Sequence, residues 1–343
     1  MVIRFTFDSK LTTAANIILL KKICFSHFIV IICLSTMLTS CLTDHNIDVS
    51  GIRLNTDIKR FDSAFFETPN TDFSSDLEVL KKEYPAMFTN GAKGKFWINQ
   101  RSDKLQNELY TASKKALNPN ISTEIRQALK HLKYYELTPL PKSVYTYISR
   151  LDFDYPVLYA DSLLFVASDL YLGADSKFYQ GMPAYLSFER EAVFLLPDAL
   201  EPLIKAQTTA PSQNPSLLDD MVQRGKIIYA LKKVLPHYSV PALLKYLPKE
   251  YQFCQENERS IWAYFIEQDL LFNTSQDVKR RFMLPAPFSK FRTHLDKESP
   301  GQVGWFTGYQ IVNAYAEESG QSLKEILREK DARKILKISN YKP

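Results

Sequence analysis

Glycine is scarce along this chain, which holds 10 glycines among 343 residues. That is about 3%, against about 7% in an average soluble protein. Tight turns and phosphate-binding loops depend on glycine, because glycine reaches positive φ angles without strain. The chain is therefore unsuited to a glycine-punctuated β-barrel or to a nucleotide fold with a glycine-rich loop. Its 22 Phe and 19 Tyr can fill a sizeable core, so the composition favours a helix-rich or α+β protein.

The first forty residues have the pattern of a secretory signal. A basic pair precedes a mostly apolar run over residues 23–38, and Leu-Thr-Ser-Cys follows, ending at Cys41. A short basic stretch, an apolar run and small residues before a cleavage point are typical of a signal peptide. The ending resembles a bacterial lipoprotein box, which implies that Cys41 carries lipid and becomes the mature N-terminus. The alternative is an uncut transmembrane helix over 23–39.

The net charge of the chain comes largely from this leader. Residues 1–40 hold four basic residues and one acidic residue, so they supply +3 of the total +5 and leave +2 for the rest. A nucleic-acid-binding protein concentrates basic residues on one face, so we expect no nucleic acid partner. Beyond Cys41 the only cysteine is Cys254, so the mature chain has no internal disulfide, and Cys254 is expected to be a buried structural residue.

Strand-like patterns gather in one part of the chain. Residues 144–148, 155–160 and 163–167 are rich in Val, Ile, Tyr and Phe, which favour strands. The sequence predicts a small antiparallel sheet around 143–172. A further strand is expected before Phe61, and helices are expected elsewhere, so the predicted fold class is α+β and mostly helical.

Apolar periodicity and start signals predict the helices. Long helices are expected over 97–117 and 249–272. Capping-box patterns and N-terminal prolines mark helix starts, and we place such starts at Ser75, Ser322, Asn214-Pro215 and Ser299-Pro300.

These patterns also suggest how the chain is organised. The expected parts are a lipoprotein signal peptide at 1–40, a lipidated tether at 41–56, an N-terminal helical part at 57–140, and a sheet with further helices at 141–343. The last two parts are expected to form one compact unit.

The only candidates for catalysis are clustered carboxylates. Glu189 and Glu191 flank an arginine, and Asp198 follows near a predicted helix start. Paired carboxylates can act as general acid and base, so Glu189, Glu191 and Asp198 are the candidates for a peptide or glycan hydrolase. The alternative is that these acids only complement the positive end of a helix dipole or form ion pairs on the surface. Because the sequence lacks His-Glu-x-x-His, a P-loop and a nucleophile elbow, we lean towards a non-enzyme and expect no cofactor and no metal.

Three glycines stand close together on the helix that contains Trp305. Gly301, Gly304 and Gly308 fall within eight residues, although glycine weakens a helix by about 1 kcal/mol relative to alanine. Either another backbone packs closely there, or a ligand or partner peptide lies on that face. The candidate partner-binding residues are Tyr185, Trp305, Gly308 and Tyr309.

Several blocks of the chain follow one another in a distinctive order: Tyr171-Leu172-Gly173 with Phe178-Tyr179, Met182-Pro183-Ala184-Tyr185, and residues 221–226, 261–267, 285–291 and 299–312. Together with the lipoprotein box, these blocks resemble the gliding-motility lipoprotein GldB family of Bacteroidetes. The resemblance implies an envelope lipoprotein associated with gliding and with type IX secretion, with no established enzymatic activity. Its partners would be the membrane, reached through the lipid, and envelope proteins of the secretion or motility machinery.

The chain has a strand-rich segment followed by helices, an acid-rich helix before Gly225, and a Gly-Tyr helix with an Ile-Val pair. This order resembles a family of predicted zinc peptidases, which carry His-Glu-x-x-His on the helix after the sheet. Here that region, residues 194–202, has no histidine. The resemblance implies a zincin-like scaffold without its metal, whose groove could still bind a peptide; function must be argued from the site, not the fold.

Two remaining patterns concern modification and location. Asp62-Ser63-Ala64 and Asp161-Ser162-Leu163 resemble an O-glycosylation motif of Bacteroidetes, which makes Ser63 and Ser162 candidates. Leu42 after Cys41 resembles the outer-membrane sorting pattern of other bacteria. We therefore expect a lipid-anchored protein of the cell envelope, with the outer membrane favoured over the inner.

Overall fold

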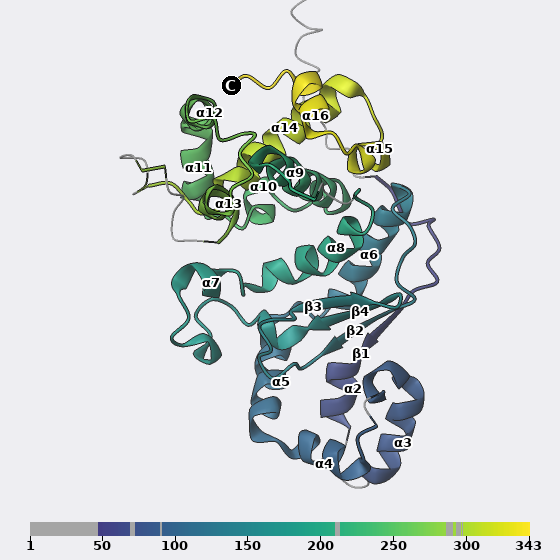
Figure 1. Ribbon diagram of the computed structural model, residues 1–343. Helices are drawn as coiled ribbons and strands as arrows, with labels where there is room; N and C mark the ends of the chain where they lie inside the picture. The colour runs from purple at the N-terminus through teal and green to yellow at the C-terminus, as the bar shows by residue number, and fades with distance from the viewer. Residues whose placement is uncertain are drawn as a thin grey trace, which may run out of the picture. The chain divides into compact units, whose positions relative to one another are not determined.

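The computed structural model describes residues 47–68, 73–89, 91–209, 213–285, 291–292, 296 and 298–343. Asp48–Pro343 form one compact unit, which is mostly helical and contains a small mixed sheet (Figure 1). The predicted α+β class is therefore confirmed. The leader and Cys41 lie outside the described residues. None of the described helices is both long and apolar enough to span a bilayer.

The strands are β1 (Asp57–Arg60), β2 (Ser143–Tyr147), β3 (Val157–Ala160) and β4 (Leu163–Ala167). The helices that precede the last three strands are α2 (Phe61–Glu67), α3 (Phe73–Glu83), α4 (Gly94–Ser102), α5 (Lys104–Ala116) and α6 (Ile121–Tyr134). Those that follow are α7 (Ala184–Phe188), α8 (Leu195–Lys205), α9 (Leu217–Val234), α10 (Val240–Leu243), α11 (Pro248–Glu256), α12 (Glu258–Glu267), α13 (Gln276–Met283), α14 (Val303–Ser319), α15 (Leu323–Arg328) and α16 (Ala332–Ser339).

The sheet is mixed, so the prediction of an antiparallel sheet is wrong. Within the described residues the strand order is β1-β2-β4-β3. β1 and β4 both run parallel to β2, and only β3 and β4 are antiparallel. β3 and β4 form a hairpin through Asp161 and Ser162, both at positive φ, as tight hairpin turns require. Strand patterns along the chain reveal this local pairing but not the pairing of strands that are distant in sequence.

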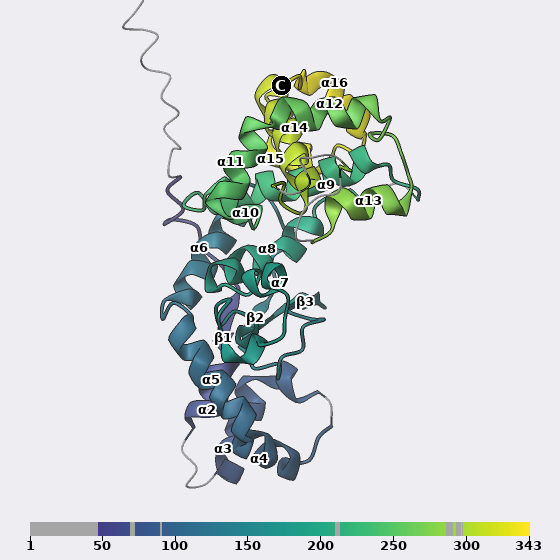
Figure 2. The same cartoon turned by 90° about the vertical axis from the view of Figure 1, so that its left-hand side faces the viewer.

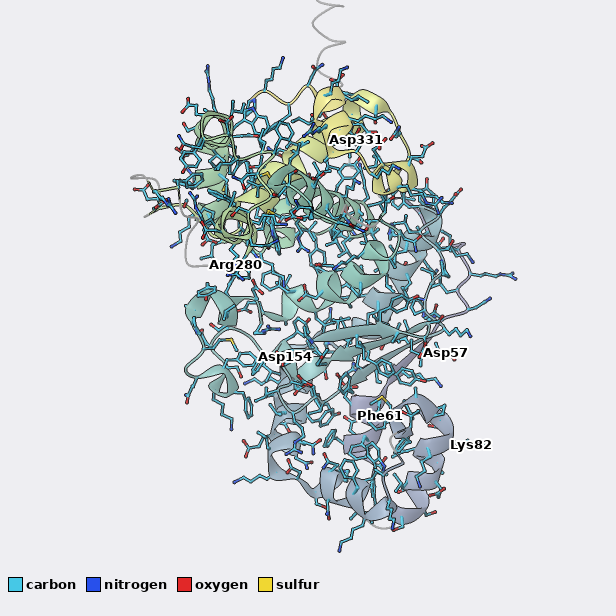
Figure 3. The ribbon with its side chains drawn as sticks, viewed as in Figure 1. Asp57, Phe61, Lys82, Asp154, Arg280 and Asp331 are labelled. Carbon is cyan, nitrogen blue, oxygen red and sulfur yellow. The ribbon has the colours of Figure 1, made fainter. Side chains whose placement is uncertain are left out.

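Helices cover both faces of the sheet. α8 packs on β3 and β4 and also contacts α9, whereas α2 packs on β2 and α6 on β1. Figures 1 and 2 both show α2 to α5 on one side of the sheet and α9 to α16 on the other. Phe61 begins α2 beside the sheet (Figure 3) and belongs to a small aromatic core with Phe65, Phe66 and Trp97. The larger core lies between the sheet, α8, α9 and α14.

Asp62 joins the start of α2 to the sheet. Its buried carboxylate accepts hydrogen bonds from Thr146 Oγ1 on β2 at 2.6 Å and from Ser168 Oγ at 3.1 Å. Arg60 Nε donates to the same group at 2.9 Å. A buried carboxylate with this many donors stabilises the fold instead of being an isolated buried charge.

α9 and α14 pack with their backbones in direct contact. A Cβ atom added at Gly225 would lie 2.1 Å from Gly308 O, and one added at Gly308 would lie 1.9 Å from Met221 O. A Cβ at Gly304 would lie 2.5 Å from Met283 Sδ. Close helix packing, the first of the two explanations for the glycine cluster, therefore accounts for Gly304 and Gly308.

Several predicted helix limits differ from the observed ones. The expected helix over 97–117 is two helices, because Asp103 ends α4 and caps α5 by accepting from Gln106 N at 2.9 Å. The expected helix over 249–272 breaks at Asn257 and ends at Glu267.

Four predicted helix starts can also be compared with the structure. The cap at Ser322 is confirmed. The start at Asn214-Pro215 is wrong because Ser216 caps α9 through a box with Asp219. Ser75 lies inside α3, and α14 begins after Gln302, not after Ser299.

Candidate functional site

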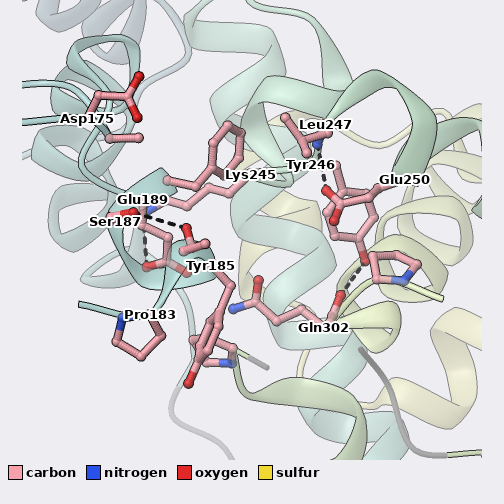
Figure 4. Close-up of a pocket in the computed structure, with 16 residues that line it drawn as sticks. Asp175, Pro183, Tyr185, Ser187, Glu189, Lys245, Tyr246, Leu247, Glu250 and Gln302 are labelled. Carbon is pink, nitrogen blue, oxygen red and sulfur yellow. Dashed lines mark hydrogen bonds and ion pairs between the residues drawn. The ribbon is translucent and has the colours of Figure 1, made fainter. Parts of the chain in front are cut away.

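A groove of about 620 Å³ opens between α7, the segment before α11 and the loop that precedes α14 (Figure 4). Each wall comes from a different part of the chain, so no single sequence motif describes it. The lining residues are Ala174, Asp175, Pro183, Ala184, Tyr185, Ser187, Phe188, Glu189, Lys245, Tyr246, Leu247, Glu250, Pro285, Pro300, Gly301 and Gln302. Its size falls within the range of about 300–1,000 Å³ typical of small-ligand sites.

Neighbouring elements hold the walls of the groove. The ring of Phe188 packs edge-on against Phe194, with 5.4 Å between centroids, and this fixes the short helix α7 against α8. On the opposite wall, Tyr246 OH donates to Gly301 O at 2.9 Å. Tyr246 is buried, so this bond ties the segment before α11 to the loop before α14.

Lys245 brings two of the predicted carboxylates together. Its Nζ lies 3.0 Å from Asp198 Oδ1 and 3.9 Å from Glu189 Oε2. Tyr171 OH donates to Asp198 Oδ2 at 3.1 Å. The three charged side chains are each less than a fifth exposed. The lysine is thus shared by two partly buried acids, and Asp198 has a second donor in Tyr171.

The pKa of Glu189 is raised above its ordinary value. Burial is the main cause; the nearby charge of Lys245 opposes the rise, and the charge of Asp198 adds to it. Glu189 therefore keeps its proton to a higher pH than an exposed glutamate, as carboxyl groups in functional clefts often do. In chemical terms it could serve as a proton donor or as a recognition group for a cation.

Behind the groove, a second ion pair connects α8 to α9. Arg224 Nη1 lies 2.5 Å from Glu201 Oε1. The guanidinium also stacks on Trp305, with 3.5 Å from Cζ to the ring centroid, and Trp305 Nε1 donates to Met283 O at 3.0 Å. Trp305 is therefore held in the packing between helices and does not line the groove.

The other predicted site residues lie apart from the groove lining. Glu191 Oε1 accepts from Ala174 N at 2.9 Å, so Glu191 holds the loop that lines one wall and does not pair with Glu189. Gly308 is enclosed between α9 and α14, and Tyr309 is buried. Among the four predicted partner-binding residues, only Tyr185 lines the groove. Cys41 lies outside the described residues, so its lipidation stays a prediction.

The two candidate O-glycosylation sites have different surroundings. Ser63 lies in α2, directly after the buried Asp62, and Tyr110 OH lies 3.5 Å from its Oγ. Ser162 lies in the β3–β4 turn at the edge of the sheet. Both serines are half-buried, and glycosylation of either residue stays a prediction.

Lys245 and Gln302 are among the groove residues that were not predicted from the sequence. Lys245 stands alone among Leu243, Leu244 and Tyr246, and a lone lysine in an apolar run can indicate a buried ion pair. No sequence pattern marks Gln302 as a groove residue. Its backbone is left-handed, at φ 57°, and this conformation is usually adopted by glycine, so a glutamine does not predict it. Over the part of the chain that the structure describes, no group of three or more His, Cys, Asp or Glu side chains could hold a metal ion.

A family model described as gliding motility protein GldB matches residues 43–343. No curated protein and no solved structure matches significantly. The family model spans the whole compact unit, so the family resemblance found in the sequence is confirmed. The chain therefore belongs to the gliding motility protein GldB family.

Proposed function

We propose that this chain is a lipid-anchored protein of the cell envelope that binds protein partners of the gliding-motility machinery and catalyses no reaction. Membership of the GldB family supports the link to gliding. The observation that carries the non-catalytic part is that two of the candidate carboxylates are already engaged. Asp198 is bound by Lys245 and Tyr171, and Glu191 by the backbone of Ala174. What remains is a largely apolar groove suited to binding.

The anchor is tested by changing its cysteine. Cells that express Cys41→Ala should incorporate no alkyne-palmitate into the protein, and the variant should leave the membrane fraction for the soluble fraction. The reason is that several acyl chains, at about 0.8 kcal/mol per buried CH2, hold a protein stably at a bilayer. Cys254→Ala is the matched control, because Cys254 is buried in the fold, and this variant should keep both label and membrane. A labelled, membrane-bound Cys41→Ala protein would contradict the anchor.

We place the protein in the outer membrane and associate it with type IX secretion. Leu42 after Cys41 supports the outer-membrane location. Membership of the GldB family supports the association with secretion. Separation of the two membranes on a sucrose gradient tests the location. Enrichment with inner-membrane markers would overturn it.

Partners are identified by crosslinking tagged protein in intact cells, followed by mass spectrometry. Secretion or motility components should be recovered from the parent protein and lost from Cys41→Ala, which is displaced from the membrane. Equal recovery from both proteins would contradict a partner role that depends on the anchor.

A second candidate function is peptide or glycan hydrolysis, which the raised pKa of Glu189 in the groove favours. Under our proposal, fluorogenic peptide and glycan pools show no turnover by the parent protein above that by Glu189→Gln. Turnover by the parent that Glu189→Gln abolishes would establish the hydrolase instead. Glu256→Gln is the control, since Glu256 lies on α11 outside the groove lining.

A further inference from the structure

One buried hydrogen-bond donor in the groove has no acceptor in the part of the chain that the structure describes. Gln302 is 5% exposed, and its Nε2 makes no hydrogen bond within the described residues. Figure 4 shows the side chain extending into the groove from the loop before α14. Leaving a buried amide donor unpaired is unfavourable, so this amide requires an acceptor that the described residues do not supply.

The backbone on both sides of the groove is strained. Gln302 has φ 57° and Lys245 has φ 56°, a left-handed conformation that disfavours residues with a Cβ. Such strain is concentrated at binding and active sites. These are two of the ten non-glycine residues with positive φ that the structure describes, and both line the same groove. The surrounding fold thus holds both side chains where they face the groove.

Negative charge exceeds positive charge along the groove. Among the described residues, Asp175, Glu189 and Glu250 line it, and Lys245 is the one basic side chain in that lining. Lys245 is shared between Asp198, which lies behind the lining at 3.0 Å, and Glu189 at 3.9 Å, and Glu250 accepts from Leu247 N at 2.7 Å. A single lysine among these acids leaves the described lining with a net negative charge, which Asp175 and Glu189 present to an occupant, so the complementary ligand is cationic.

The rest of the lining suits the side chains of a peptide. Three prolines face the groove, at 183, 285 and 300, together with Phe188 and the half-exposed Leu247. Proline has no N–H, so the proline-containing walls offer few backbone donors. The amide of Gln302 is a buried donor that a peptide carbonyl can satisfy, while the apolar walls accept the side chains of the peptide.

We propose that the groove binds an extended peptide segment of a partner protein. A backbone carbonyl of the peptide accepts from Gln302 Nε2, a lysine or arginine faces Glu189 and Asp175, and an apolar side chain packs on Phe188 and Leu247. This inference rests on the proposed partner-binding role and specifies its ligand.

Entry of the peptide requires one side chain to move. Nε2 of Gln302 is shielded from bulk water, so a lining residue must turn aside before a carbonyl can reach it. Tyr185, on the five-residue helix α7, is half-buried, and its hydroxyl makes no hydrogen bond among the described residues. Turning this ring costs no hydrogen bond.

The test uses purified full-length protein in detergent and fluorescein-labelled heptapeptide pools, random except for a central lysine, glutamate or norleucine. Fluorescence anisotropy should give at least tenfold tighter binding for the lysine pool than for the glutamate pool. Gln302→Leu keeps the buried volume and removes the donor, so it should weaken binding of the lysine pool about tenfold. Glu189→Gln should abolish the preference for lysine over norleucine.

Two controls separate a loss of binding from a loss of folding. Gln302→Leu removes an unpaired buried amide, so its thermal unfolding midpoint should be unchanged or raised. Gln310→Leu makes the same chemical change on α14, where the amide is bonded to Glu258 at 3.2 Å, and should leave peptide binding unchanged. Binding that is insensitive to Gln302→Leu, equal affinity for all pools, or Gln302-dependent binding of a chito-oligosaccharide pool in place of peptides would each overturn the proposal.

The outcomes also separate this proposal from the broader one. Crosslinked partners that are recovered equally with the parent protein and with Gln302→Leu would leave the partner role intact and overturn the groove as its site. Peptide binding by the purified protein without any partner recovered from cells would support the groove and contradict the role in the envelope machinery.

Discussion

Gly308→Ala should lower the free energy of unfolding by about 3 kcal/mol, the upper end of the usual cost of overpacking. The new methyl group would lie 1.9 Å from the backbone oxygen of Met221. Backbone cannot turn aside as a side chain can, so α9 and α14 must separate along their shared face. The gain of about 1 kcal/mol in helix propensity offsets only part of this loss. Urea unfolding of the full-length protein in detergent measures the change.

Gly94→Ala is the matched control for this substitution. Gly94 is also helical, at the first position of α4, and its added Cβ would meet Leu77 Cδ2 at an ordinary 3.7 Å. This variant should be as stable as the parent or slightly more stable. Gly225→Ala should resemble Gly308→Ala, because it opens the same contact, and the two losses should not add. A Gly308→Ala protein with parental stability would mean that α9 and α14 do not touch there.

Arg224→Met should cost about 3 kcal/mol at neutral pH, since breaking a largely buried ion pair leaves an uncompensated charge. The Arg224 side chain is 11% exposed, and its partner Glu201 is 29% exposed. The double variant Arg224→Met with Glu201→Met removes both charges and should recover most of the stability. A double variant as unstable as Arg224→Met alone would show that the stacking on Trp305, and not the ion pair, carries the effect.

The same pair gives a pH dependence with a defined sign. Burial raises the pKa of Glu201, but the charge and hydrogen bond of Arg224 outweigh it and hold the pKa below the ordinary value. A carboxylate whose pKa is lowered by folding stabilises the protein above its unfolded pKa, near 4.3. This stabilisation is lost as the pH falls through the folded pKa. The cost of Arg224→Met should therefore shrink in unfolding measurements made below about pH 4.

Patterns within short segments predicted the fold class well. Alternating aromatic and β-branched residues located β2, β3 and β4, and Ser322 located the start of α15. β1 has only one apolar residue, Ile58, and its partner β2 lies far along the chain. No local pattern can encode such a pairing. Nor does a local pattern show that β2 pairs with β4 in parallel, past the intervening β3, so the sequence alone predicts an antiparallel sheet.

The candidate site could be predicted only in part, because its residues also come from segments that are distant in the sequence. Tyr185 and Glu189 stood out because they lie in or beside a distinctive motif, and both line the groove. Lys245 and Gln302 reach it from segments far apart in the sequence, and their left-handed backbones are imposed by tertiary packing. Gly308 was correctly recognised as unusual, but sequence alone could not decide between a helix partner and a ligand.

The position of β1 also determines when this protein can complete its folding. Thr56 Oγ1 donates to Pro141 O across 85 residues, and β1 then runs beside β2. A chain that emerges from its N-terminus first must therefore keep this strand unpaired until nearly half its length has appeared. Closing so long a loop is slow but adds little entropic cost beyond that of a shorter one. Because β1 is mostly polar, the unpaired strand exposes little apolar surface on which aggregation could begin.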